Sequence, residues 1–186
     1  MSERNKATEL NHRAPYATPD EITWLQLCAA GLPKNGQVVI LGAGPGVMAT
    51  ALKDGNATLN IYIVDHDTCF WAITHLMSFG NDYSDRVAGV ISDSSQAGKV
   101  YVGPNLDLLI VDADHSEEGV TRDILAWIGH VKEGGLIFFH DYDARETMFA
   151  NQEQYPGVKI AVDRCMSEDI YEAQVGTALV VRKRST

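Results

Sequence analysis

The chain has 186 residues, of which 45% are hydrophobic, and its formal net charge at pH 7 is −10. The length and composition suit one globular domain with a sizeable core, whereas the negative charge excludes a nucleic-acid backbone as the main partner. No apolar stretch approaches the roughly 20 residues needed to span a bilayer, and the polar start lacks the apolar segment of a signal peptide. We therefore expect a soluble, cytoplasmic protein with neither nucleic acid nor a membrane as a partner.

Residues 1–14 are polar and show no pattern, so we expect a flexible N-terminal arm ahead of a single domain at 15–186. The domain begins with a clear helix start. Thr18 is a capping residue, a proline follows it, and Glu21 stands three residues after the cap. Apolar residues at helical spacing come next, and the helix is expected to end near Gly31.

After Gln37 the sequence alternates between short apolar stretches and stretches with helical spacing. Strands are expected at 38–41, 59–64, 87–91, 107–111 and 136–139. Helices are expected at 46–53, 68–79 and about 117–131, with an irregular stretch at 94–105. Because the strands are apolar throughout and separated by helices, this alternation is typical of a parallel sheet covered on both faces.

The end of the chain departs from this alternation. A helical stripe at 158–166 is followed by two strands, 170–175 and 177–181, on either side of Gly176. Strands joined so tightly can only pair antiparallel. The sequence therefore predicts an α/β, doubly wound, Rossmann-like fold whose seven-stranded sheet is mostly parallel and ends in a C-terminal antiparallel hairpin.

A glycine-rich turn separates the first strand from its helix. The stretch VVILGAGPGVMATAL places Gly42, Gly44 and Gly46 there, where a lack of side chains lets the backbone approach a ligand closely. Asp65 comes nineteen residues after Gly46, at the end of the second strand, as expected of a carboxylate that accepts both ribose hydroxyls. This pattern favours a nucleoside-containing cofactor over the alternative of a tight turn and an N-capping Asp.

The spacing of the turn distinguishes between cofactors. A dinucleotide site has G-x-G-x-x-G, but here Val47 stands where the third glycine would fall. The third strand ends in ISDSSQ, which offers Asp93 as an acceptor for an exocyclic adenine amine and Ser94 as a neighbouring polar contact. The glycine turn, Asp65 and Asp93 together resemble the class I S-adenosylmethionine-dependent methyltransferases, and the final hairpin is also typical of that family.

This resemblance implies S-adenosyl-L-methionine as the cofactor. In that family three strand ends hold its methionine part, its ribose and its adenine in turn. The expected cofactor-binding residues are Gly42, Ala43, Gly44, Gly46, Asp65, His66, Asp93, Ser94 and Asp112.

A second motif lies in LDLLIVDADHSEEGVTRDILAWIGHVKEGGLIFFHDYD, residues 106–143. It is similar to the group that includes the macrolide-sugar O-methyltransferases and the cephalosporin-biosynthesis methyltransferase-like enzymes, with D-x-x-H after the fourth strand and an H-D or E-D pair after the fifth. That resemblance implies Asp112, His140 and Asp141 as ligands of a divalent metal, Mg²⁺, Mn²⁺ or another, and His115 as the catalytic general base.

Two residues depart from the family pattern. Ile40 stands two places before the first glycine, where many members carry an acidic residue, and His140 stands where Glu or Asp is usual. Imidazole suits Mn²⁺, Fe²⁺ or Zn²⁺ better than Mg²⁺, so either the metal has changed or the site has lost it. His115, His140 and one carboxylate would also match a two-His-one-carboxylate iron site. Asp114 would cap the next helix or contact the cofactor.

We therefore expect an S-adenosylmethionine-dependent methyltransferase that performs metal-assisted O-methylation of a small hydroxylated substrate, a sugar or a phenol. Such hydroxyls are poorly ionised at neutral pH, and a base together with a divalent cation lowers that barrier. The alternatives are a non-catalytic S-adenosylmethionine-binding module and an NAD-dependent oxidoreductase, for which the turn spacing is wrong. A small molecule is the expected partner, with a homo-oligomer as an open alternative.

Several other side chains have structural interpretations. Trp24, Trp71 and Trp127 lie in apolar helical faces and are interpreted as core. The three cysteines are likewise interpreted as reduced core residues. Tyr16 and Tyr142 lie beside the predicted crevice, where either ordinary packing or an acceptor pocket would account for them. Taken alone, the aspartate and the histidine of D-x-x-H would equally fit a helix cap and a structural histidine.

Overall fold

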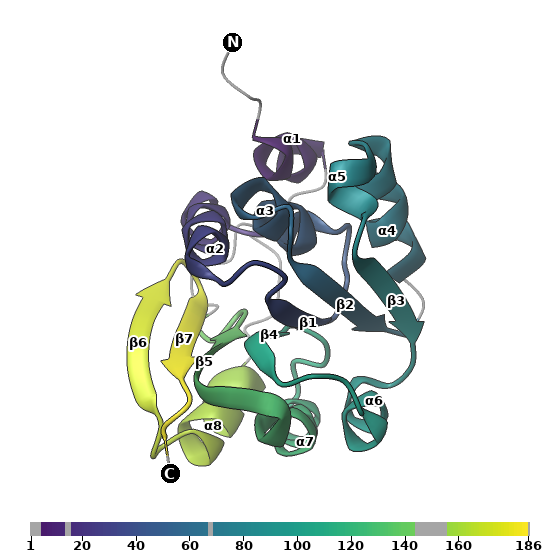
Figure 1. Cartoon of the computed structure of the whole chain (residues 1–186). Coiled ribbons are helices and arrows are strands. Elements are labelled where there is room, and N and C mark those ends of the chain that lie inside the picture. The colour runs from purple at the N-terminus through teal and green to yellow at the C-terminus, as the bar shows by residue number, and fades with distance from the viewer. Residues whose placement is uncertain (1–4, 14–15, 67–68, 144–155, 186) are drawn as a thin grey trace.

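A seven-stranded sheet with helices on both faces forms the body of the computed structural model, which describes residues 5–13, 16–66, 69–143 and 156–185 (Figure 1). The strand order is β3-β2-β1-β4-β5-β7-β6. The strands are β1 (Gln37–Leu41), β2 (Asn60–Asp65), β3 (Val87–Ile91), β4 (Leu106–Val111), β5 (Val131–Phe139), β6 (Ile170–Val175) and β7 (Ala178–Arg182). The first five run parallel, and β7 pairs antiparallel with both β5 and β6, which confirms the predicted fold class and the hairpin.

Two groups of helices cover the sheet, as Figure 1 shows. One face carries α1 (Lys6–Arg13), α2 (Pro19–Gly31), α3 (Val47–Gly55), α4 (Cys69–Ser78) and α5 (Asn81–Ser84). The other carries α6 (Ser94–Val100), α7 (Glu117–Trp127) with the 3-10 turn Ile128–His130, and α8 (Pro156–Cys165). No helix of the described ranges is both long enough and apolar enough to cross a membrane.

Alternating residues of the central strands divide the core in two. In β1, Val38 and Ile40 point into the cluster beneath α2 and α3, whereas Val39 and Leu41 point into the cluster beneath α7 and α8. All four are at most 2% exposed. Burial of side chains of this size stabilises by about 1.5–3 kcal/mol each. β1 is apolar from Val38 to Leu41 because both of its faces are covered.

The order of the strands determines where the site lies in the sheet. β1 lies between β2 and β4, so the chain leaves the sheet in opposite directions from β1 and β4 and a crevice opens at their carboxyl ends. The two strand ends are joined at this point, because the N–H of Asp112 donates to the carbonyl oxygen of Leu41 at 2.9 Å. The turn after β1 and the acidic residues after β4 therefore lie side by side.

The N-terminal segment differs from the expected loose arm. Lys6–Arg13 form α1, whose Ala7 and Leu10 are buried against the core beneath α2 and α3. The N–H of Ala7 donates to Asp54 Oδ2 at 2.9 Å. Two apolar residues three apart are too weak a sequence pattern to predict this helix, which depends on its tertiary contacts. Residues 1–4 and 14 lie outside the described part of the chain.

The stretch expected to be irregular at 94–105 also contains a helix, α6. Asp93 caps it by accepting the N–H of Gln96 at 2.9 Å. The helix has only seven residues, Ser94–Val100. Serine and glycine are poor helix formers, so neither propensity nor periodicity indicates the helix in the sequence.

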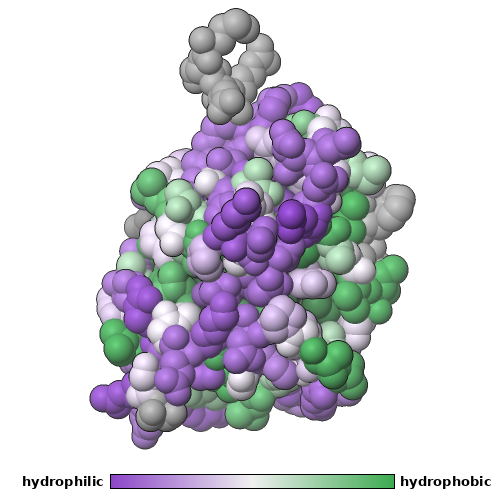
Figure 2. Space-filling model, viewed as in Figure 1, coloured by the Kyte–Doolittle hydropathy of each residue, from purple (hydrophilic) through white to green (hydrophobic). Residues whose placement is uncertain are grey.

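The expected tryptophan core is confirmed only in part. Trp127 is 1% exposed and Trp24 packs against the core, but Trp71 on α4 is 67% exposed. Met77 of α4 and Ile91 of β3 are also exposed, and Figure 2 shows green, apolar residues on the right, the side on which Figure 1 places α4 and β3. Cys28 and Cys165 are half-buried and free, and the side chain of Cys69 lies outside the described part.

Candidate active site

The glycine turn leaves no room for side chains. Gly42 has φ 87° and Gly44 has φ 44°, both in the left-handed region that favours glycine. A Cβ atom at Gly42 would overlap the carbonyl oxygen of Asp112, and one at Gly44 would overlap the ring of Tyr16. The turn is therefore closely packed against the end of β4 on one side and an aromatic ring on the other.

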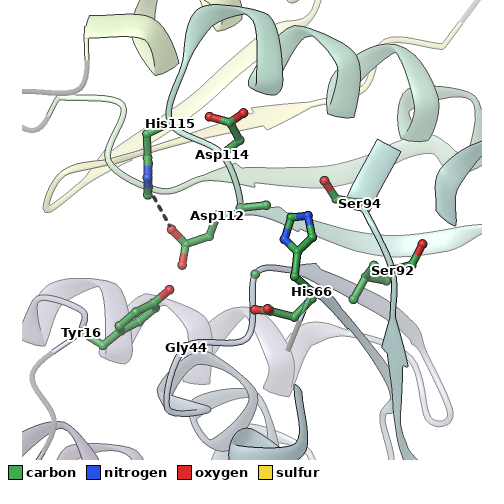
Figure 3. Close-up of a pocket in the computed structure, with 12 residues that line it drawn as sticks. Tyr16, Gly44, His66, Ser92, Ser94, Asp112, Asp114 and His115 are labelled. Carbon is green, nitrogen blue, oxygen red and sulfur yellow. Dashed lines mark ion pairs between the residues drawn. The ribbon is translucent and has the colours of Figure 1, made fainter. Parts of the chain in front are cut away.

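A cavity of about 340 Å³ opens at the ends of β1, β2 and β4, and we call it the strand-end cavity (Figure 3). Six of the nine predicted cofactor residues line it: Gly42, Gly44, Asp65, His66, Ser94 and Asp112. Tyr16, Val64, Ser92, Ala113, Asp114 and His115 complete the lining. The predicted residues are thus brought together around one hollow.

The other three predicted cofactor residues, Ala43, Gly46 and Asp93, are not among the residues that line this cavity. The N–H of Ala43 donates to Asp65 Oδ2 at 2.6 Å, so the Asp65 carboxylate holds the turn in place. Gly46 has φ 90° and packs on Ala72 of α4. Asp93 accepts from the Ser95 hydroxyl at 2.7 Å as well as capping α6. Contact of Asp93 with adenine stays a prediction.

Ser94 connects the cavity to a buried carboxylate that sequence reasoning missed. Its hydroxyl donates to Asp123 Oδ1 at 2.6 Å, and its carbonyl accepts from the Trp127 indole at 2.8 Å. Because the Ser94 hydroxyl proton is already used in this hydrogen bond, a ligand in the cavity would have to donate a hydrogen bond to the Ser94 hydroxyl oxygen. Burial, together with the charges of Asp93 and Asp114, raises the pKa of Asp123 to about 6.

Four predicted residues gather where β4 and β5 end. Asp112, His115, His140 and Asp141, which we call the ligand cluster, each offer one potential ligand atom, and these atoms all lie within 4.8 Å of one another. His140 Nδ1 is 2.9 Å from Asp112 Oδ1 and 3.4 Å from Asp141 Oδ2. His115 Nε2 is 3.5 Å and 3.4 Å from the same two oxygens. Asp112 belongs to both the cluster and the strand-end cavity.

Burial and opposite charges act against each other in the ligand cluster. Burial alone would raise the pKa of Asp112, but the charges and hydrogen bonds of His140 and His115 outweigh it and lower the pKa to about 2. Burial would lower the pKa of His115, but Asp112 and Asp141 raise it to about 9. The pKa of His140 is raised well above its ordinary value for the same reason. Without another cation, His115 therefore favours its protonated form at neutral pH.

Glu21 is a further residue of the site that sequence reasoning recognised only as part of a helix cap. Its capping box with Thr18 is present, and the carboxylate is also fully buried. Oε2 lies 3.5 Å from His140 Nε2, and Oε1 accepts the N–H of Thr177 at 2.9 Å. His140 thus lies between two buried carboxylates, Glu21 and Asp112. No separate signal in the sequence distinguishes this role from capping.

Backbone strain marks the same place. Asp141 has φ 54°, in the left-handed region that non-glycine residues rarely adopt, and its Oδ1 lies 3.2 Å from Thr177 Oγ1. Such conformations persist where surrounding contacts hold them, often at functional sites. Asp114, expected to cap the next helix or contact the cofactor, does not cap α7, because the capping residue is Ser116. Asp114 instead accepts the Ser116 N–H at 2.8 Å and lines the cavity.

The two tyrosines have different surroundings. Tyr16 lines the strand-end cavity, and burial together with the charges of Asp112 and Asp65 raises its pKa well above its ordinary value, so its hydroxyl keeps its proton. Tyr142 instead donates to Asp163 Oδ1 and accepts from Lys159, away from that cavity.

The sheet order, the terminal hairpin and the crevice lined by the glycine turn define the class I S-adenosylmethionine-dependent methyltransferase fold. A family model described as a methyltransferase domain matches residues 39–142, more than half of the chain. The protein belongs to this methyltransferase-domain family. No curated protein sequence gives a significant match.

Solved structures share the fold at low identity. The SAH-bound methyltransferase PaMTH1 of Podospora anserina is 15% identical with a TM-score of 0.75, over 97% of this chain and 86% of its own. The O-methyltransferase of Bacillus cereus in complex with SAH is 16% identical with a TM-score of 0.67, over 96% and 87%. The O-methyltransferase TomG of Streptomyces achromogenes, involved in tomaymycin synthesis and solved with SAM, is 13% identical with a TM-score of 0.68, over 100% and 92%.

Proposed function

We propose that this protein transfers the methyl group of S-adenosylmethionine to a hydroxyl oxygen of a small molecule, with a divalent metal held by Asp112, His140 and Asp141 of the ligand cluster. The observation that carries the proposal is the position of Asp112. Its carbonyl oxygen packs on Gly42 of the glycine turn, and its carboxylate belongs to the cluster. A methyl donor in the strand-end cavity would therefore lie directly beside the groups that orient and deprotonate an acceptor.

The strand-end cavity fits the cofactor. Its volume of about 340 Å³ lies within the range of small-molecule sites. Gly42 and Gly44 leave backbone exposed to a ligand, and Asp65 stands at the end of β2 where a ribose would lie. S-adenosylhomocysteine or S-adenosylmethionine bound to the solved neighbours of Bacillus and Streptomyces supports the same choice.

The ligand cluster fits a divalent metal. Asp112 Oδ2 is buried and accepts no hydrogen bond from the described residues, as expected of an oxygen reserved for a cation. His140 presents Nδ1 to the cluster and Nε2 to Glu21, the arrangement in which an outer carboxylate orients a metal-binding histidine. Asp112, Asp141 and His140 offer two oxygen donors and one nitrogen donor, and the nitrogen favours Mn²⁺, Fe²⁺ or Zn²⁺ over Mg²⁺. When bound, the cation would lower the pKa of the acceptor hydroxyl and fix its oxygen.

His115 is the proposed base. It lines the strand-end cavity and also a second, open hollow of about 630 Å³ that includes Ser116, Glu117 and Gly157, which we propose as the acceptor side. An acceptor entering from this hollow would meet His115 before reaching the cofactor. In its neutral form, His115 would take the hydroxyl proton on Nε2 while the oxygen attacks the methyl carbon, the bond from sulfur to that carbon breaks, and S-adenosylhomocysteine leaves.

One observation favours a second candidate, a cofactor-binding module without catalysis. Asp112 and Asp141 raise the pKa of His115 to about 9, which leaves the imidazole protonated and unable to accept a proton at neutral pH. The family assignment, in contrast, argues against the NAD-dependent oxidoreductase. The two remaining candidates bind the same cofactor, but only the first catalyses methyl transfer.

Calorimetry and a transfer assay test the proposal. The wild-type chain should bind S-adenosylhomocysteine and should methylate a member of a panel of sugars and phenols in the presence of Mn²⁺. Asp65→Ala should weaken cofactor binding about tenfold or more, whereas His115→Ala should preserve binding and slow transfer by 10²–10⁴-fold. Binding without transfer, with or without metals, would favour the non-catalytic module, and equal loss of binding in both variants would contradict the assigned roles.

A further inference from the structure

Tyr16 stands where the strand-end cavity meets the ligand cluster. Its side chain lines the cavity together with Gly44 and Asp112. Its hydroxyl points toward the carboxylate of Asp112, as Figure 3 shows. One tyrosine therefore borders both the space proposed for the cofactor and the groups proposed for the metal.

The ring of Tyr16 has two close neighbours. It stacks on the imidazole of His140, with 5.9 Å between the ring centroids and 7° between the planes. It also packs against Gly44, where no Cβ atom would fit. The ring therefore limits rotation of His140 and forms part of the wall beside the glycine turn.

Helix α1 holds the segment that carries this ring. Asn11 Oδ1 accepts the N–H of Tyr16 at 2.8 Å and the N–H of Ala17 at 3.1 Å, and Asn11 Nδ2 donates to the carbonyl oxygen of Ala17 at 2.8 Å. The buried Ala7 and Leu10 attach α1 to the core. The position of Tyr16 is thus fixed by a helix that lies outside the matched family region, 39–142.

We propose that Tyr16 is a positioning residue with two separable parts. Its ring shapes the cavity beside the glycine turn and contributes to cofactor affinity. Its hydroxyl faces the carboxylate of Asp112 and helps to orient it toward the metal. This inference rests on the proposed function, because it requires that the cavity takes S-adenosylmethionine and that the cluster takes a divalent cation.

Two substitutions separate the parts when S-adenosylhomocysteine and Mn²⁺ are titrated into the full chain by calorimetry. Tyr16→Phe keeps the ring, so S-adenosylhomocysteine affinity should stay within twofold of wild type, while Mn²⁺ affinity should fall about tenfold because an outer partner of Asp112 is lost. Tyr16→Leu removes ring and hydroxyl, so both affinities should fall about tenfold. Asn11→Ala should reduce both by a smaller factor, about threefold.

Tyr101→Phe is the matched control. It removes a hydroxyl that donates to the carbonyl oxygen of Pro104 at 2.9 Å, on the connection between α6 and β4, and should change neither affinity. Thermal unfolding of every variant shows whether it is folded, and Asn11→Ala tests the proposal without altering Tyr16 should either Tyr16 variant fail to fold.

The outcomes distinguish the two proposals. If the wild type binds both ligands but Tyr16→Leu binds S-adenosylhomocysteine equally well, or if Tyr16→Phe and Tyr16→Leu change both affinities by the same factors, the positioning role is wrong and the proposed function stands. If the wild type binds S-adenosylhomocysteine but no Mn²⁺, the hydroxyl part of the role is overturned. If the wild type binds neither ligand, the proposed function is wrong, and the positioning role, which depends on it, is wrong too.

Discussion

The two halves of the site are built by different means. Beside β1 and β2, room for a ligand comes from the absence of side chains at Gly42 and Gly44, and backbone forms the surface. Beside β4 and β5, the space is filled by buried charges, and Asp112 and His140 compensate each other. The first half therefore depends on steric room and the second on charge balance. Adding a methyl group should damage the first, and removing a charge should damage the second.

Replacing His140 should have the largest effect on stability. His140→Leu would leave the buried carboxylates of Glu21 and Asp112 without their shared cationic partner. Breaking a buried pair in this way costs about 3–5 kcal/mol. Denaturant unfolding at pH 7 measures the change in the free energy of unfolding.

A histidine away from the charged half gives the control. A ring nitrogen of His130 contacts the carbonyl oxygen of Gly98 at 2.9 Å, and its ring packs on Trp127. His130→Leu should therefore cost only about 1 kcal/mol. Equal losses in the two variants would mean that charge balance does not distinguish the β4–β5 half.

The glycine half should respond to a single methyl group. Gly42→Ala would place Cβ against the carbonyl oxygen of Asp112 at a φ that disfavours alanine, with an expected cost of about 2–3 kcal/mol and a loss of S-adenosylhomocysteine binding. Calorimetry and thermal unfolding check both effects. Gly129→Ala, where an added Cβ meets nothing within 4 Å, should leave both unchanged. Normal cofactor binding by Gly42→Ala would show that the turn tolerates side chains.

The same contrast explains what the sequence could predict. A requirement for glycine is visible in the sequence itself, and so are apolar strands bounded by turns, so the sheet, the hairpin and the turn are confirmed. Asp112, His115, His140 and Asp141 follow from their places after two adjacent parallel strands, which the resemblance to known methyltransferases connected to metal binding. The structure brings them within one cluster, although their roles stay predictions.

Contacts between distant segments could not be predicted in this way. Glu21 has every local feature of a capping residue, and only the packing of α2 against the ends of β5 and β7 brings it to His140 and Thr177. Tyr16 follows a segment whose helical pattern is too short to recognise. Asp123 appears on a helix as an ordinary polar residue, and its burial depends on how α6 packs against α7.

Asp123 is a buried carboxylate that lacks the histidine partners of Asp112, so it shows what burial without charge compensation does to a carboxylate. Its raised folded pKa of about 6, against an ordinary 3.8, means that the folded state binds more protons between these values. Stability should therefore fall as the pH rises from about 4 to 6. Asp123→Asn removes this dependence and should be more stable than wild type by about 1–2 kcal/mol at pH 7.

Unfolding by urea across pH 4–8 measures this difference. Glu118→Gln changes an exposed carboxylate of the same helix, α7, and should leave the wild-type slope between pH 4 and 6 intact. A wild-type stability that rises over this range in parallel with Asp123→Asn would contradict the raised pKa and would place Asp123 with the compensated carboxylates.

The smallest expected effect concerns the start of α2, where Thr18 caps the helix and Glu21 also faces His140. The Thr18 hydroxyl accepts the N–H of Glu21 at 3.3 Å, while the N–H of Thr18 donates to the Glu21 carboxylate at 2.7 Å. Thr18→Ala removes only the first contact, so it should cost about 1 kcal/mol and leave S-adenosylhomocysteine and Mn²⁺ affinities within twofold of wild type. The Glu21 carboxylate still has Thr177 to hold it beside His140. A tenfold loss of Mn²⁺ affinity in Thr18→Ala would instead mean that the cap itself positions the charged half of the site.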